Sequence, residues 1–225
     1  MGPFDIKSLW ESHNEKAWCD ALGRYWENPT VVNNREIELL MGKVDIEFVT
    51  NLGPREWYDF LDKYFRWKFK GNYLDDRLKD LAKNSLEELV SVKRSLIAVA
   101  VDEFELADIR RCLKLVKSPQ IKCLVYPGAS GLLAVLFKGW YGTVDRMVVD
   151  SLCEVESLPE TERVREIDTW LKSKKDWEVR DAVLLIDIMR RKAVQLNGWF
   201  DTEKWTPRKI DMVLWTFRNG GTCAG

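Results

Sequence analysis

Apolar residues recur at helical spacing along almost the whole chain, and this periodicity constrains the fold more than any other feature. Trp57, Phe60, Leu61 and Tyr64 follow Pro54 so that they share one face of a helix. Proline suits the first turn of a helix, because a helix start needs no N–H there. The same apolar pattern returns after capping or proline residues in segments 86–96, 106–116, 164–171, 179–196 and 207–217. We therefore predict about ten helices.

Signals at the ends of these segments agree with the periodicity. Ser85-Leu86-Glu87-Glu88 has the spacing of a capping box, and Asp176 is a candidate cap for the longest helix, which Asn197-Gly198 would end. Only short segments such as Val31–Val32 are compatible with extended backbone, and no strand–turn–strand pattern is convincing. The predicted class is all-α: a multi-helix orthogonal bundle, built as one domain over residues 1–225 or as two helical lobes.

The composition is that of a globular protein without a general affinity for nucleic acid. Apolar residues make up 46% of the chain and charged residues 32%, which argues against disorder. The 35 basic residues are balanced by 36 acidic ones, for a net charge of -1. The basic field that usually accompanies strong nucleic-acid binding is therefore absent. Any contact with DNA requires a local basic face.

Metal, cofactor and membrane signals are missing from the sequence. A single histidine and cysteines without a C-x-x-C pair are too few and too scattered for a zinc site or an iron–sulfur cluster. No apolar run reaches the length of a signal peptide or a membrane span. We expect no cofactor, no metal and no membrane association, and free thiols in the reducing cytoplasm. The cysteines are Cys19, Cys112, Cys123, Cys153 and Cys223.

A Pro-Gly pair followed by small residues separates a short apolar segment from an apolar helix. If these residues form a turn, their backbone N–H groups are uncovered beside the positive end of the helix dipole. That geometry suits an anion such as a DNA phosphate. The alternative is a tight corner whose small residues allow two helices to pack closely, and both interpretations are open. The residues are Pro127, Gly128, Ala129, Ser130 and Gly131.

The segment Val144-Asp145-Arg146 follows after a further turn, at the start of the next helix. With Tyr126-Pro127-Gly128-Ala129-Ser130-Gly131, it resembles the helix-hairpin-helix DNA glycosylase superfamily, which includes endonuclease III and the 8-oxoguanine glycosylases. The resemblance covers residues 121–150. It implies hairpin amides that hold a phosphate, and a catalytic role for Asp145 at the sugar of a flipped-out nucleotide. Leu132 stands where bifunctional members keep a lysine nucleophile, so the implied enzyme is monofunctional.

Asp145 also has a purely structural interpretation, as the N-cap of the helix that it begins. Arg146, directly after it, is a candidate cation for DNA binding. The two interpretations of Asp145 remain open from the sequence.

A second candidate surface alternates basic and aromatic residues. In extended backbone, Arg66, Lys68 and Lys70 would share one face, with Trp67 and its aromatic neighbours on the other. This face would supply the local basic patch, with the aromatic rings packed beneath it or stacked on bases. The alternative is a loop held by buried aromatic rings, with solvated lysines.

Two functions follow from these patterns. The first is a DNA-binding helix-hairpin-helix protein, which includes the narrower hypothesis of a divergent monofunctional base-excision glycosylase. The second is a non-enzymatic helical module that binds a protein partner and keeps the hairpin as scaffold. Motifs for nucleotide binding, serine hydrolysis or zinc proteolysis are absent from the sequence. The sequence contains no pattern that indicates which base is recognised or what the oligomeric state is.

Overall fold

The structure is a computed structural model that describes residues 5–99 and 104–217. Within these ranges the chain forms fourteen helices joined by turns and contains no strand, so the predicted all-α class is confirmed. The number exceeds the prediction because short helices, such as α3 (Pro29–Val32) and α5 (Ile46–Thr50), carry too few turns to show a period. None of the described helices has the length and apolar character needed to cross a membrane.

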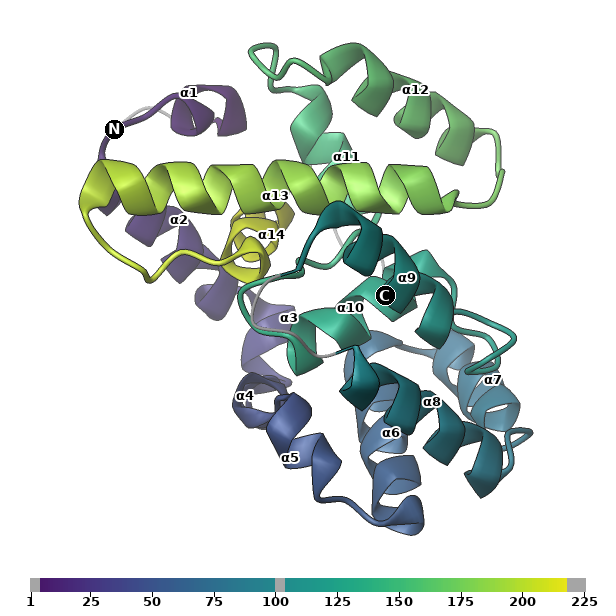
Figure 1. Ribbon diagram of the computed structural model, residues 1–225. Coiled ribbons are helices and arrows are strands. Elements are labelled where there is room, and N and C mark those ends of the chain that lie inside the picture. Colours follow the sequence, from purple (N-terminus) through teal and green to yellow (C-terminus); the bar gives the residue numbers. More distant parts are fainter. Residues whose placement is uncertain (1–4, 100–103, 218–225) are drawn as a thin grey trace. The chain divides into compact units, whose positions relative to one another are not determined.

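The chain divides into two compact units, and the first combines residues 1–32 with residues 142–225. Its last helix is its centre, because α14 contacts α2, α11 and α13. The longest helix, α13, is drawn in yellow-green in Figure 1, and α12 packs on α11. Besides α3, the helices of this unit are α1 (Ile6–Trp10), α2 (Glu15–Glu27), α11 (Arg146–Cys153), α12 (Thr161–Lys172), α13 (Val179–Phe200) and α14 (Pro207–Thr216).

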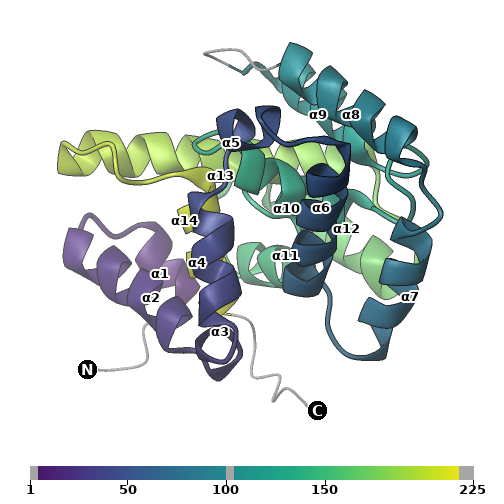
Figure 2. The same cartoon turned by 90° about the horizontal axis from the view of Figure 1, so that it is seen from below.

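The second unit, residues 33–141, is organised around α6. This helix contacts α4, α7, α8 and α10, while α8 also packs against α5 and α9. Figure 2 shows α8 and α9 side by side. Besides α5, the helices of this unit are α4 (Arg35–Lys43), α6 (Pro54–Lys68), α7 (Asn72–Leu81), α8 (Leu86–Ala98), α9 (Leu106–Val116) and α10 (Tyr126–Leu136).

The predicted helix ends are partly confirmed. Ser85 forms the capping box with Glu88: the Ser85 hydroxyl accepts from the Glu88 N–H at 3.1 Å, and the Glu88 carboxylate accepts from the Ser85 N–H at 2.7 Å. The predicted ends of the longest helix are wrong. Helix α13 begins after Glu178 instead of Asp176. It continues past Asn197-Gly198 to Phe200, and its C-cap Asp201 adopts left-handed backbone with φ 48°.

Asn197 lies within the helix, and its side chain bonds to the chain beyond the helix. Its amide donates to the Trp205 carbonyl and accepts from the Trp205 N–H, both at 2.9 Å. Val31–Val32, a segment that the sequence left compatible with extended backbone, lies in α3. Val31 is buried there against Tyr25 and Met212, and this packing outweighs the β preference of valine.

Candidate nucleic-acid interface

The hairpin between α9 and α10 lies earlier in the chain than the sequence suggests. Its loop is residues 117–125, closed by a hydrogen bond of 2.7 Å from the Ser118 N–H to the Leu124 carbonyl. Helix α10 begins at Tyr126, so the predicted phosphate-binding turn from Pro127 to Gly131 is helical instead. The Ala129 N–H donates to the Val125 carbonyl at 2.8 Å. The prediction of an open bend with uncovered amides at these residues is therefore wrong.

The small residues of α10 allow this helix to approach α6. A Cβ added to Gly131 would lie 2.7 Å from the Tyr64 hydroxyl oxygen. One added to Gly128 would lie 2.7 Å from the Leu124 side chain and 3.3 Å from that of Phe69, the residue after α6. The Tyr64 hydroxyl donates to the Gly128 carbonyl at 2.5 Å, and Ser130 is fully buried. Close packing, the second interpretation of these residues, is the geometry found. Pro127 fits because the second position of a helix needs no N–H.

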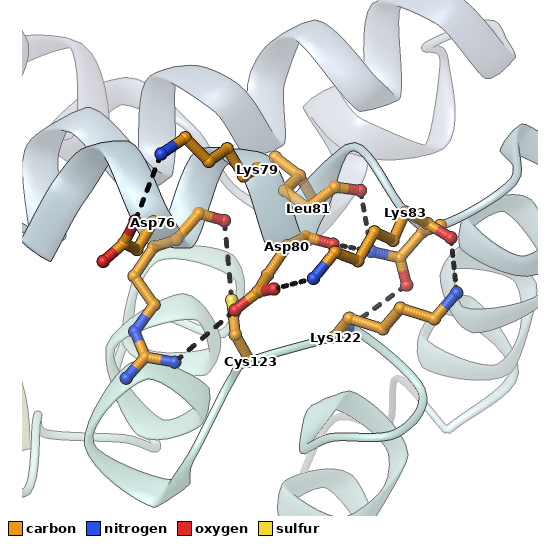
Figure 3. Close-up of polar contacts among 9 residues, drawn as sticks. Asp76, Lys79, Asp80, Leu81, Lys83, Lys122 and Cys123 are labelled. Atoms are coloured by element: carbon orange, nitrogen blue, oxygen red, sulfur yellow. Dashed lines mark hydrogen bonds and ion pairs between the residues drawn. The ribbon is translucent and has the colours of Figure 1, made fainter.

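The hairpin loop is tied to the end of α7 by polar contacts that Figure 3 shows in close-up. The Asn84 side chain accepts from the Lys122 N–H at 3.1 Å, and the Cys123 thiol donates to the Arg77 carbonyl at 3.6 Å. Cys123 adopts left-handed backbone with φ 67°, and burial raises the pKa of its thiol to about 11. The loop is thereby fixed against α7, with an unreactive thiol.

The basic residues around this loop are matched by acidic ones. Lys79 pairs with Asp76 at 3.3 Å and Lys83 with Asp80 at 2.6 Å, as Figure 3 shows. Lys122 lies 3.6 Å from the Glu88 carboxylate. The hydrogen bond from Lys83 is the main cause of the lowered pKa of Asp80, which keeps this carboxylate charged. These three lysines lie beside carboxylates and have little net attraction for a polyanion, whereas Lys117, at the start of the loop, lies over the Tyr126 ring at 5.1 Å from its centroid.

The basic and aromatic segment 63–73 is mostly helical, so the predicted period-two face does not exist. Arg66 points away from the core and pairs with Asp62 at 2.6 Å, which raises the pKa of Arg66. Trp67 is only 8% exposed and cannot stack on a base. Lys68 is half-buried beside α10, and Lys70 donates to the Asn34 side chain at 3.0 Å. This segment forms a helix and not extended backbone because Tyr64 and its neighbours continue the apolar face of α6.

Asp145 is the N-cap of α11. Its carboxylate accepts from the Val148 N–H at 3.1 Å, the geometry of the structural interpretation. The segment before it is fixed to α14, because buried Asp211 accepts from the Thr143 N–H at 2.5 Å and from Arg208 at 2.6 Å. Arg146 is exposed and lies 4.0 Å from Asp150. Both Asp145 and Arg146 belong to the first unit, whereas α10 belongs to the second.

One surface that the sequence analysis missed carries cations without acidic partners. Arg110, Arg111 and Lys114 are exposed on α9, and none forms an ion pair in the described part of the chain. The opposite face of α9 is buried through Ile109 and Leu113. We call these three residues the α9 basic face. The sequence contains its signal, since Lys114 lies four residues after Arg110 and three after Arg111, the spacing of neighbours on one helix face.

The described residues therefore define an all-α protein of two helical units, the second of which holds a helix–loop–helix whose first helix is basic. Comparison of the chain with protein-family models, with curated proteins and with solved structures finds no match. The similarity to the glycosylase superfamily thus depends only on the residues quoted from the sequence.

Proposed function

We propose that this chain binds DNA through the α9 basic face, on the first helix of its helix–loop–helix. The observation that carries the proposal is the absence of acidic partners for Arg110, Arg111 and Lys114 among the described residues. Lys114 lies four residues after Arg110 and three after Arg111, so these like charges are neighbours on the helix surface and repel one another. A polyanion would relieve the repulsion by neutralising all three groups.

The helix also holds these cations in a defined geometry. Ile109, Cys112, Leu113 and Val116 anchor the other face of α9 in the core, so the backbone beneath the basic residues is fixed. A spacing of three to four residues places neighbouring side chains about 5–6 Å apart at Cβ. Long arginine and lysine side chains at this distance can reach adjacent phosphates of one DNA strand, which position a protein without reading the bases.

DNA binding through the α9 basic face requires no catalytic role for Asp145, whose carboxylate accepts a hydrogen bond from the first turn of its own helix. The resemblance to the glycosylases supports a DNA partner by analogy alone. Base excision stays a narrower prediction, which release of a base from a damaged oligonucleotide by the full chain would establish.

The test measures binding of a labelled duplex to the full chain by fluorescence anisotropy at about 50 mM salt, where phosphate contacts contribute strongly. A variant with Arg110→Glu, Arg111→Glu and Lys114→Glu should bind about tenfold more weakly or worse. The matched control reverses Lys16, Arg55 and Lys79, three exposed cations that already pair with acids on their own helices. It changes the net charge equally and should bind like the natural chain.

Equal loss of affinity in both triple variants would show that only net charge matters and would remove the α9 basic face as the binding site. No binding by the natural chain at low salt would favour the second candidate, a non-enzymatic module that binds a protein.

A further inference from the structure

A lysine of the first unit is buried among tryptophan rings. Lys192, on α13, is only 4% exposed. Its ammonium nitrogen lies 4.7 Å from the ring centroid of Trp10, 5.5 Å from that of Trp18 and 4.9 Å from that of Trp199. It donates to the Trp10 carbonyl at the end of α1, and to the Gln195 side-chain oxygen at 2.7 Å. No carboxylate of the described chain forms an ion pair with it.

The same lysine lines a cavity of about 310 Å³ in this unit. Trp10, Leu158 and Ile188 supply apolar parts of its wall, and Gln195 supplies a polar part. Two charged groups also line it, and both have partners. Arg191 is held by Glu160 at 2.7 Å and by Asp187 at 3.0 Å, while Glu11 accepts a hydrogen bond from Ser157. Lys192 is thus the cationic group of the wall that lacks a carboxylate partner.

Burial of Lys192 favours a neutral amine, while the faces of the three tryptophan rings attract its ammonium form. Burial lowers the pKa of Lys192 to about 8, against a smaller opposite effect of Glu11. At neutral pH about a tenth to a fifth of such an amine is uncharged, against about one in a thousand for an ordinary lysine. A neutral amine at this site would donate its two N–H groups to the Trp10 carbonyl and the Gln195 side chain and would keep its lone pair.

Another buried lysine of the chain has a different environment. The Lys93 amine, in the second unit, is surrounded by the carbonyls of Val49, Thr50 and Leu52. Three acceptors suit the three N–H groups of an ammonium ion. Lys93 therefore serves as a buried reference whose amine is surrounded by three carbonyl acceptors.

We propose that Lys192 is a nucleophilic amine that forms an imine with a small aldehyde or ketone bound in this cavity. The nitrogen lone pair attacks the carbonyl carbon, and the carbonyl oxygen takes up a proton to give a carbinolamine. Nitrogen then loses its remaining proton, the oxygen leaves as water, and a C=N bond replaces the C–N and C–O bonds. The step needs no oxidant, and water is its only by-product. The volume lies at the lower end for ligand pockets, so the ligand is small.

The test treats the full chain with benzaldehyde and sodium cyanoborohydride, which reduces an imine to a stable secondary amine. Peptide mass spectrometry then gives the labelling rate of each lysine between pH 6.5 and 9.5. Lys192 should label at least about tenfold faster than Lys93 and exposed Lys16 at pH 7.4, with a midpoint near its pKa of about 8. A rate at Lys192 no higher than that at Lys93 would overturn the proposal.

A second variant tests the cavity without altering the amine. Ser157 is an exposed residue of the cavity wall, and Ser157→Trp would narrow the cavity at low risk to the core. Labelling of Lys192 should fall several-fold in this variant, while labelling of Lys16 stays unchanged. Equal labelling of Lys192 in the variant and the natural chain would show that the aldehyde does not reach the amine through this cavity, and would contradict the assignment.

Discussion

The contact between α6 and α10 gives a sharp prediction about Gly131. A Cβ at this position would lie 2.7 Å from the Tyr64 hydroxyl oxygen, whose ring is fully buried and whose hydrogen bond to the Gly128 carbonyl measures 2.5 Å. The hydroxyl cannot move without losing that bond, so Gly131→Ala overpacks the contact. Overpacking costs about 1–3 kcal/mol, whereas replacing glycine by alanine inside a helix contributes about 1 kcal/mol of stability. We expect a net loss of about 1 kcal/mol in the free energy of unfolding.

Whether Gly131→Ala lowers or raises the free energy of unfolding depends on whether the Tyr64 hydroxyl is present. Tyr64→Phe removes the hydroxyl and should cost about 1 kcal/mol for the lost hydrogen bond. In this background, Gly131→Ala no longer meets the oxygen and should raise the free energy of unfolding by a few tenths to about 1 kcal/mol. Urea unfolding of the natural chain, both single variants and the double variant gives the coupling energy, expected at about 1–2 kcal/mol.

Additivity of the two substitutions within about 0.5 kcal/mol would refute the reasoning. It would mean that Gly131 does not face Tyr64, and that the small residues of α10 serve something other than helix packing.

Three further predictions concern the first unit. Asp211→Ala should lower the free energy of unfolding by about 3 kcal/mol in urea, because it leaves Arg208 and the Thr143 N–H without their buried partner. Asp145→Ala should cost about 1 kcal/mol in thermal unfolding, and Asp145→Asn less than about 0.5 kcal/mol, since asparagine also caps helices. The unfolded chain retains the proton of Lys192 up to pH 10.5, while the folded chain loses it near pH 8. Unfolding free energy should therefore rise by up to about 3 kcal/mol between these pH values, and Lys192→Met should lack the rise.

The sequence was sufficient for the helices because their signals are local. The residues that form the apolar face of α6 are three or four positions apart, and Ser85 and Glu88 of the capping box are three apart. Both features were predicted correctly. The turn at 127–131 was not, since glycine and proline are compatible with either a turn or a helix start. Contact with Tyr64, 64 positions before Gly128 in the chain, favours the helix, and such a contact leaves no local pattern.

For the candidate binding surface too, the sequence contains the spacing of charges along a helix, but it does not contain which residues the tertiary fold buries. Arg66 has Asp62 four residues before it, a pair that the sequence already contains. Arg110 and Lys114 have the same spacing but carry like charges, so the sequence already contains the local signal of a basic face on α9. The burial of Trp67 and the enclosure of Lys192 by three separate helical segments depend on the tertiary fold.

The dependence of DNA affinity on salt tests the central claim most directly. Each phosphate neutralised by a cation contributes about 0.9 to the slope of log K against log salt concentration. If Arg110, Arg111 and Lys114 each contact a phosphate, reversing all three should reduce the magnitude of that slope by about 2.7, whereas reversing Lys16, Arg55 and Lys79 should leave it unchanged. An identical slope for the natural chain and the α9 variant would contradict the account, because DNA would then bind elsewhere.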